Sequence, residues 1–102
     1  MWLSPVQIRV MPITDEQNSY SAEINSRLQN DGFRVELDDR NEKINYKIRE
    51  AENQKIPYMF IVGKKEVQDK NVSVRKHKAG DVGRFNLDGI IQKLKEEVKS
   101  KE

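Results

Sequence analysis

Charged side chains crowd the segment DDRNEKINYKIRE, which runs from Asp38 to Glu50. Its two neighbouring carboxylates, those of Asp38 and Asp39, belong to the residue types that hold magnesium or transfer protons. Neighbouring residues of a strand point to opposite faces of a sheet, however, so this pair is poorly placed to share one site. We therefore expect these acids to cap a helix and to form ion pairs with basic side chains rather than to catalyse a reaction.

Other kinds of chemical site find little support. The chain has one histidine, His77, and no cysteine, so it cannot supply the usual zinc ligands. The segment GKKE (63–66) lacks the earlier glycine and the following Ser/Thr of a phosphate-binding loop. No serine or threonine has an evident base partner for nucleophilic catalysis. We expect no metal, no cofactor and no catalytic residue.

The composition fits one small domain spanning residues 1–102. Hydrophobic and charged residues each make up 35% of the chain, and the hydrophobic ones fall in periodic runs, which argues against a disordered chain. No apolar run approaches the roughly 20 residues that a membrane span needs, and the first residues do not resemble a secretion signal. The absence of cysteine is typical of a reducing compartment, so we expect a cytoplasmic protein.

Charge is distributed unevenly along the chain. Residues 1–39 contain three basic and seven acidic residues, whereas residues 40–102 contain sixteen basic and ten acidic ones. The stretch from Lys70 to Gly80 holds four Lys/Arg and no acid. This polarity favours a polyanionic partner, although a lysine-rich solvated surface gives the same pattern.

Hydrophobic periodicity in the first half predicts strands that alternate with helices. The segment VQIRVMPI (6–13) alternates apolar and polar residues like a strand, which Pro12 ends. The following TDEQ (14–17) has the spacing of a capping box. Apolar residues then recur every fourth position, as Tyr20, Ile24 and Leu28, up to a glycine stop at NDG (30–32). The segment FRVEL (33–37) alternates again and predicts a second strand.

The second half continues this alternation. A helix is predicted over residues 41–54, capped by Asp39 or Asn41, with Ile44, Ile48 and Ala51 facing inward. The run PYMFIV (57–62) is typical of a central strand covered on both faces. The short segments EV (66–67) and NVSVR (71–75) suggest the two strands of a hairpin that turns across residues 68–71. We expect a short edge strand at GRFNL (83–87) and a last helix over 88–100.

The predicted fold is α/β, with a mixed four- to five-stranded sheet and three helices in the order β-α-β-α-β-β-(β)-α. Alternating strands and helices imply right-handed crossovers and parallel strands in the first half. An antiparallel hairpin follows.

Polar residues gather where the second and third predicted strands end. Ligands of open α/β sheets bind beyond the carboxyl ends of the parallel strands. These ends fall at residues 38–41 and 63–66, so we expect the two stretches to lie side by side at one rim, with the strand of Arg75 next to them. The rim would combine Arg40, Asn41, Lys43, Lys64, Lys65 and Glu66. This mixture of amide, carboxylate and basic groups suits the base edges and phosphates of unpaired RNA.

These residues also have purely structural interpretations. Asn41 can serve only as a helix cap, and Glu66 can pair with Lys64 or Lys65. Arg75 can be an ordinary exposed strand residue. At this point the sequence leaves both interpretations open.

Four segments resemble, in their order and spacing, the C-terminal anticodon-binding domain of threonyl-tRNA synthetases: WLSPVQIRVMPIT, GFRVELDDRNEKINYKIREAE, KIPYMFIVGKKE and VSVRKHKAGDVG. The resemblance covers nearly the whole chain. A broader pattern, D-x-R-N-E-K followed by I-P-Y and V-G, is shared with related synthetases such as the prolyl enzyme. The combination of NEKINYKIRE with VGKKEV and VSVR is closer to the threonyl branch.

The resemblance implies a five-stranded mixed sheet with three helices, and recognition of the last two anticodon bases of threonine tRNA, a guanine and a uracil. It assigns base contacts to Asn41 and Glu66, and the reading of the guanine to Arg75. A guanidinium can donate two hydrogen bonds to O6 and N7 of guanine. Arg49 matches a family arginine, and Lys55 stands where the family often has one.

Six basic residues near these positions are expected to contact phosphates: Arg40, Lys43, Lys64, Lys65, Lys76 and Lys78. Where the family has arginines, this chain has KHKAG after VSVR and Gln54-Lys55 before IPY. Lysine keeps the charge and lacks the forked guanidinium, so we expect phosphate attraction there rather than bidentate readout. The charge cluster would pack one side on the sheet and line an RNA-binding rim with the other, its acids orienting the bases.

We therefore expect a non-catalytic tRNA-binding module of a larger synthetase whose catalytic domain is absent from this chain, monomeric when isolated. Two other classes stay open. An accessory or protein-interaction domain of the same fold would lack specific RNA binding. A small flavodoxin-like enzyme would bind a flavin or nucleotide, which the missing phosphate loop argues against. RNA binding separates the first class from our expectation, and a flavin titration tests the second.

Overall fold

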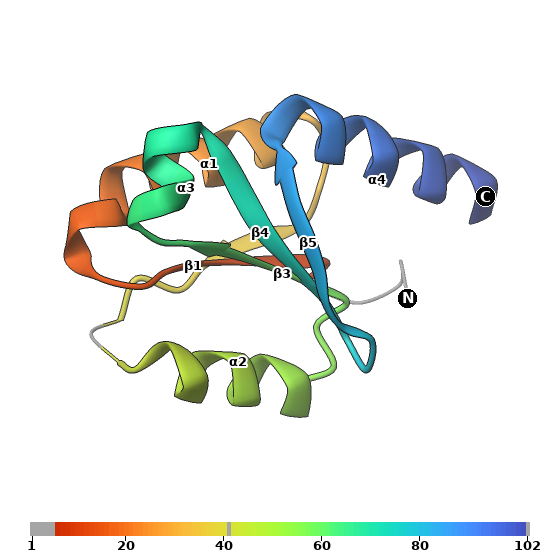
Figure 1. Cartoon of the computed structure of the whole chain (residues 1–102). Helices are drawn as coiled ribbons and strands as arrows, with labels where there is room; N and C mark the ends of the chain where they lie inside the picture. The colour runs from red at the N-terminus through yellow and green to blue at the C-terminus, as the bar shows by residue number, and fades with distance from the viewer. Residues whose placement is uncertain (1–5, 41, 102) are drawn as a thin grey trace.

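The computed structural model describes residues 6–40 and 42–101, and its strands and helices alternate along the chain (Figure 1). The strands are β1 (Ile8–Pro12), β2 (Val35–Leu37), β3 (Tyr58–Val62), β4 (Asn71–Lys76) and β5 (Gly80–Asn86). The helical elements are a 3-10 turn η1 (Asp15–Gln17), then α1 (Asn18–Asn30), α2 (Ile44–Asn53), α3 (Lys64–Asp69) and α4 (Leu87–Lys101).

The five strands form one mixed sheet in the order β2-β1-β3-β4-β5. β1 pairs in parallel with β2 on one edge and with β3 on the other, whereas β4 is antiparallel to both β3 and β5. Every residue of β1 is buried, as the inner position of this strand requires. The prediction of a mixed sheet with a parallel first half is confirmed.

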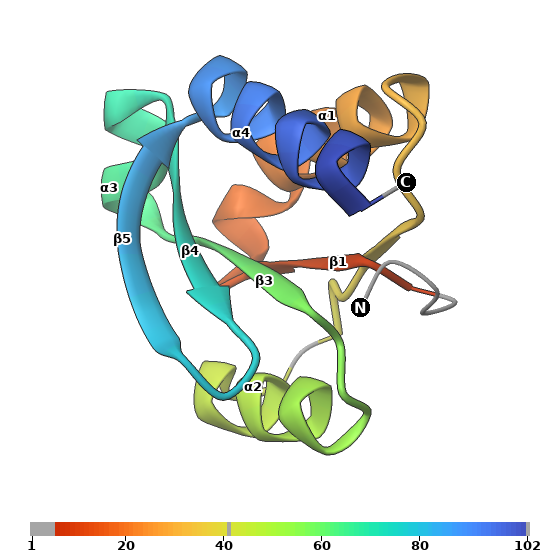
Figure 2. The same ribbon diagram turned by 90° about the vertical axis from the view of Figure 1, so that its right-hand side faces the viewer.

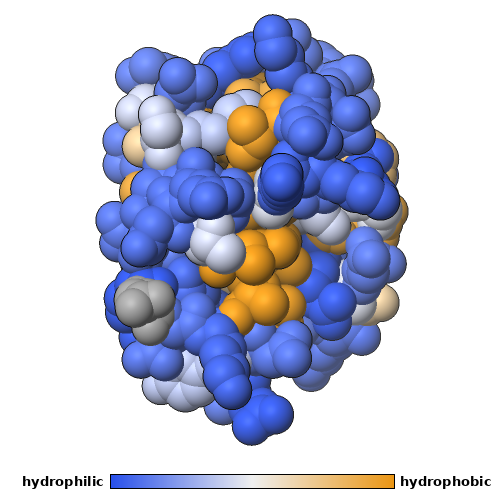
Figure 3. All heavy atoms as spheres, turned by 60° about the vertical axis from the view of Figure 1, so that its left-hand side comes forward, coloured by the Kyte–Doolittle hydropathy of each residue, from blue (hydrophilic) through white to orange (hydrophobic). Residues whose placement is uncertain are grey.

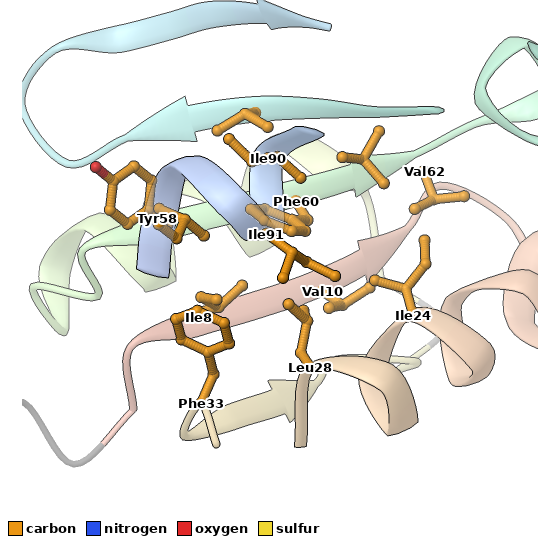
Figure 4. Packing of buried hydrophobic residues seen from close by; sticks show 13 residues of the cluster. Ile8, Val10, Ile24, Leu28, Phe33, Tyr58, Phe60, Val62, Ile90 and Ile91 are labelled. Atoms are coloured by element: carbon orange, nitrogen blue, oxygen red, sulfur yellow. The ribbon is translucent and has the colours of Figure 1, made fainter. Parts of the chain in front are cut away.

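Helices cover both faces of the sheet (Figure 2). On the face of α1 and α4, the larger core contains Ile8, Val10, Ile24, Leu28, Phe60, Val74, Ile90 and Leu94, several of which are drawn in Figure 4. On the face of α2, a smaller core consists of Met11, Ala51, Ile56 and Met59. Successive strand residues supply opposite faces, so Val10 enters one core and Met11 the other.

Local signals around α1 act as the sequence predicts. Gln17 Oε1 accepts a hydrogen bond of 2.8 Å from the backbone N–H of Thr14, which closes the predicted box at the start of η1. Ile24 and Leu28 are fully buried on the inward side of α1. Gly32, at φ +91°, takes the left-handed conformation that allows the chain to turn into β2.

Two predictions about helices are wrong. The helix α2 begins at Ile44, three residues later than expected. The N-cap position is therefore occupied by Lys43, which makes no side-chain capping bond, and not by Asp39. Asn41, the other predicted cap, lies outside the described residues.

The predicted hairpin at EV (66–67) is replaced by the short helix α3. Glu66 causes this difference, because its Oε1 accepts a 2.7 Å hydrogen bond from Gly63 N and so caps the helix start. Lys70, in a left-handed conformation at φ +55°, ends the helix. The edge strand β5 is longer than predicted, and Leu87 belongs to α4.

Candidate nucleic-acid interface

The carboxyl ends of β2, β1 and β3 meet at one edge of the sheet. The expectation that residues 38–41 and 63–66 lie side by side there is wrong for the described residues 38–40, because β1 runs between β2 and β3. Ile13, which follows β1, donates its N–H to Val62 O at 2.9 Å and is 41% exposed. The two polar stretches therefore flank a hydrophobic residue instead of touching each other. Figure 3 views the side of the molecule where α3 lies, and there hydrophobic surface gathers in the middle of a hydrophilic face.

The charge cluster after β2 is largely an internal network. Arg40 donates to both carboxylate oxygens of Asp38, at 2.8 Å and 2.9 Å, and to Glu50 Oε1 at 2.6 Å. Its guanidinium also lies 5.9 Å from the ring centre of Tyr46. Arg40, a predicted phosphate contact, thus holds two acids of its own segment, which ties the loop after β2 to α2.

These contacts shift the ionisation of both acids. Burial acts to raise the pKa of Asp38, but the hydrogen bonds and charge of Arg40 outweigh it, and the pKa lies below its ordinary value. The pKa of Glu50 is also lowered, chiefly by its hydrogen bond from Arg40. Both carboxylates therefore stay ionised at neutral pH, as partners of a cation require.

A buried arginine extends the network under α2. Arg9 on β1 is 3% exposed and donates to Glu36 at 3.1 Å and to Gln54 at 2.8 Å. Its Nη1 lies 3.7 Å from Glu50, which links it to Arg40. Alternation in the first strand predicted only a polar position here, and no local signal identifies the partners, since they come from β2 and α2.

A buried lysine connects α2 to the strand ends. Lys47 is 2% exposed, and its Nζ donates at 3.1 Å to Pro12 O and at 3.1 Å to Asp38 O. These carbonyls end β1 and follow β2, so one side chain fastens the helix to both. Sequence reasoning missed Lys47. Its position, three residues after the inward-facing Ile44 and directly before the inward-facing Ile48, was the available signal.

Glu66 lies at the start of α3 with its carboxylate divided between two neighbours. Its Oε1 is held by Gly63, whereas its Oε2 lies 3.8 Å from Arg84 Nε on β5. The side chain of Glu66 is 11% exposed. The alternative that Glu66 pairs with Lys64 or Lys65 is wrong, because its ion pair is with Arg84.

Arg75 lies on the neighbouring strand but toward the other end of β3. It is opposite Met59 in the register, whereas Glu66 lies beyond Val62, so about 10 Å of strand β3 separates the level of Arg75 from the end of the strand near Glu66. Met59 belongs to the core under α2, so Arg75 is on the same face of the sheet as α2. Arg75 is half-buried, and its Nε is a buried atom that has no hydrogen-bond partner among the described residues.

The other predicted contacts are spread around this face. Arg49 is exposed on α2, three residues before Glu52, whose backbone oxygen lies 3.1 Å from His77 Nε2 in the β4–β5 turn. Residues three apart share a helix flank, so Arg49 is on the flank that faces β4 and β5. Lys55 is exposed at φ +59° in the turn before β3.

Two lysines, one at the end of β4 and one in the turn after it, differ in direction. Lys76 Nζ lies 5.8 Å from the ring centre of Tyr58, a residue of the core under α1 and α4, so this lysine is on the face away from Arg75. Lys78 is exposed, and its N–H donates to Glu52 Oε2 at 3.4 Å. Lys43, Lys64 and Lys65 are all exposed.

The arrangement can bind but offers little to a reaction. Within residues 6–40 and 42–101, no group of three or more His, Asp and Glu side chains could hold a metal ion. No helix in the described part of the chain is long and apolar enough to cross a bilayer. We call the sheet face that lies beside α2 and carries Arg75 the open sheet face. It presents guanidinium, ammonium and carboxylate groups, which are the groups that contact phosphates and base edges.

Comparison with known proteins agrees with this chemistry. A family model described as "Anticodon binding domain" matches residues 7–97. The chain belongs to this family. Among curated relatives of this anticodon-binding domain, the threonine–tRNA ligase of Caldanaerobacter subterraneus subsp. tengcongensis is 55% identical over 98% of the chain. The same enzyme of Clostridium kluyveri is also 55% identical over 98% of the chain.

Solved structures share the fold of this anticodon-binding domain. The RNA-binding domain of threonyl-tRNA synthetase from Cryptosporidium parvum Iowa II has a TM-score of 0.88 and 32% identity, over 93% of this chain and 24% of that one. Prolyl-tRNA synthetase of Cryptosporidium parvum, at 24% identity and a TM-score of 0.83, shares the fold. The chain spans only 16% of the length of the curated ligases that it matches.

Proposed function

We propose that this domain recognises the anticodon of threonine tRNA as part of a threonine–tRNA ligase. The observation that carries the proposal is similarity to threonine–tRNA ligases along the whole chain, at 55% identity over 98% of its residues. The similarity to a solved threonyl-tRNA synthetase RNA-binding domain supports it independently, since it comes from the fold. In this proposal the domain supplies tRNA recognition and does not itself join threonine to tRNA.

The open sheet face supplies the base contacts. Arg75, half-buried on this face, reads the guanine through two parallel hydrogen bonds from its guanidinium. Glu66 uses Oε2, the oxygen not held by Gly63, to accept a hydrogen bond from a base. Arg49 borders the same face from α2. Asn41 and Lys55 complete the set on the strength of the resemblance.

Exposed lysines hold the RNA backbone. The side chains of four lysines, Lys43, Lys64, Lys65 and Lys78, are exposed and can therefore reach phosphates. Arg40 has a weaker claim because Asp38 and Glu50 already occupy its guanidinium. Lys76 lies over Tyr58 on the other side of the sheet.

The proposal also includes a cellular compartment and an oligomeric state. A cysteine-free, highly charged chain suits the cytoplasm, where tRNA is charged for translation. We infer a monomer for the isolated domain, which sedimentation at two protein concentrations tests.

Binding of an anticodon stem-loop of threonine tRNA tests the recognition step. The stem-loop is compared with one whose anticodon guanine is changed to adenine, each at two salt concentrations. We expect a preference for the guanine loop that survives the higher salt. Equal binding that disappears with salt would leave only a basic surface, and the accessory-domain class would replace our proposal.

Arg75→Lys isolates the guanine contact. Lysine keeps the charge but cannot form the bidentate pair, so the preference for guanine should fall by about 1–3 kcal/mol while binding of the adenine loop changes little. Lys78→Gln is the control, because loss of a phosphate contact weakens both loops equally. If both variants lower the two affinities alike, Arg75 does not read a base.

A further inference from the structure

We propose that Arg84 on the edge strand β5 is a further RNA-binding residue, which contacts a phosphate of the anticodon loop beside Glu66. This inference rests on the proposed function and extends its site to Arg84, which lies just beyond the segment VSVRKHKAGDVG (72–83). The observations that carry it are the direction, exposure and partners of this side chain.

The sheet register places Arg84 on the proposed RNA-binding face. Arg84 lies directly opposite Ser73 in the β4–β5 pair, and Ser73 shares its strand face with Arg75. The next residue, Phe85, packs against the core under α1 and α4, which confirms that Arg84 points the other way. Arg75 and Arg84 therefore lie on the same side of the sheet, on adjacent strands.

The guanidinium of Arg84 has donors to spare. It is 45% exposed, and its ion partners are Glu66 at 3.8 Å and Asp69 at 3.9 Å. These separations are too long for hydrogen bonds, and the described residues give it no other partner. The guanidinium makes no hydrogen bond to these acids and can donate to a ligand, and its fork matches the geometry of a phosphate.

The pairing with Glu66 explains why a cation is needed at this place. A carboxylate that accepts a bond from a base must lie close to the RNA backbone, which repels it. Arg84 Nε lies 3.8 Å from this carboxylate and offsets its charge. One guanidinium can thus hold Glu66 Oε2 in position and attract the phosphate beside the base.

The chain offers a matched control for Arg84. Arg27 on α1 is 47% exposed and also lies between two acids, Asp31 at 3.9 Å and Asp88. It differs in location, because α1 covers the opposite face of the sheet (Figure 2). A general effect of removing one exposed arginine should therefore appear equally in both variants.

The test compares Arg84→Gln and Arg27→Gln in the 102-residue chain, with the guanine and adenine stem-loops. Loss of one phosphate contact lowers the salt dependence by less than one unit of logarithmic slope. The advantage of the unmodified domain over Arg84→Gln should therefore shrink about two- to threefold between roughly 50 and 200 mM salt. Both loops should lose affinity to the same extent, so the guanine preference stays. Arg84→Lys should retain the salt slope, and Arg27→Gln should bind like the unmodified domain.

The outcomes separate this inference from the proposed function. If Arg84→Gln binds both loops like Arg27→Gln, with an unchanged salt slope, Arg84 is not an RNA contact, whatever the unmodified domain prefers. If the unmodified domain does not prefer the guanine loop, the proposed function fails instead. Circular dichroism of all three variants shows that each is folded before binding is compared.

Discussion

Replacement of Lys47 by methionine removes one amine from the interior of the domain while keeping most of the side-chain volume. Lysine and methionine have nearly equal helix propensities, so α2 itself is little affected. What is lost is a pair of 3.1 Å hydrogen bonds to Pro12 O and Asp38 O, made by a side chain that is 2% exposed. The variant therefore reports how strongly α2 is fastened to the strand ends.

The size of the effect follows from two opposing terms. Each hydrogen bond of a charged donor contributes about 1.5–3 kcal/mol, and each carbonyl left without a partner adds to the loss. Relief from burying a cation offsets part of this. We expect the free energy of unfolding to fall by about 2–4 kcal/mol, which is a large part of the about 5–15 kcal/mol that holds a domain of this size.

Urea unfolding followed by circular dichroism measures this difference. Lys64→Met, at an exposed position in the short helix α3, is the control and should change stability by no more than about 0.5 kcal/mol. If Lys47→Met is as stable as the unmodified domain, the desolvation of the amine cancels its two bonds. The view that Lys47 fastens α2 would then be refuted.

Further predictions concern Gly63, which precedes α3, and Asp38, which follows β2. In Gly63→Ala the new Cβ would lie 2.8 Å from Ile13 Cδ1 and 2.9 Å from Glu66 Oε1. We expect a loss of about 1–2 kcal/mol in urea unfolding from this overpacking, together with weaker stem-loop binding because Glu66 shifts. The folded-state pKa of Asp38 is lowered, so its stabilising effect is present above its ordinary pKa of 3.8 and is lost as the pH falls through the folded-state value. Arg40→Gln should flatten this acid loss in a series of unfolding curves at decreasing pH, and an unchanged slope would contradict the role of the pair.

The elements that the sequence predicted well are those with two distinct faces. β1 and α1 have clear periods, and β3 is a continuous apolar run because both of its faces are covered. The helix α3 was missed because six residues are too few to display a helical period, and Val67 favours a strand. The spacing of Gly63 and Glu66 was the available signal.

The strand order was beyond local patterns. A β-α-β-α-β chain with right-handed crossovers can place the first strand at an edge or in the middle of the parallel strands. The buried side chains on both faces of β1 decide in favour of the middle. The expectation that residues 38–41 and 63–66 lie side by side failed for residues 38–40 for this reason.

The buried charges of the site were also outside the reach of sequence reasoning. Arg9 and Lys47 belong to residue types that are almost never buried unless paired. Their partners come from separate segments, such as Glu36 for Arg9 and the Pro12 carbonyl for Lys47. Only the assembled sheet brings these groups together.

The inner position of β1 determines when the domain can fold during synthesis. β1 leaves the ribosome before its two pairing partners, β2 and β3, so Ile8 waits for Val35 on one edge and for Tyr58 on the other. Until then the side chains of β1 that are buried in the folded domain stay exposed, and its unpaired backbone groups form an open strand edge of the kind that promotes aggregation. A nascent chain halted after α2 would therefore display β1 with one edge bare. The last residue of β3, Val62, marks the point beyond which this strand is protected.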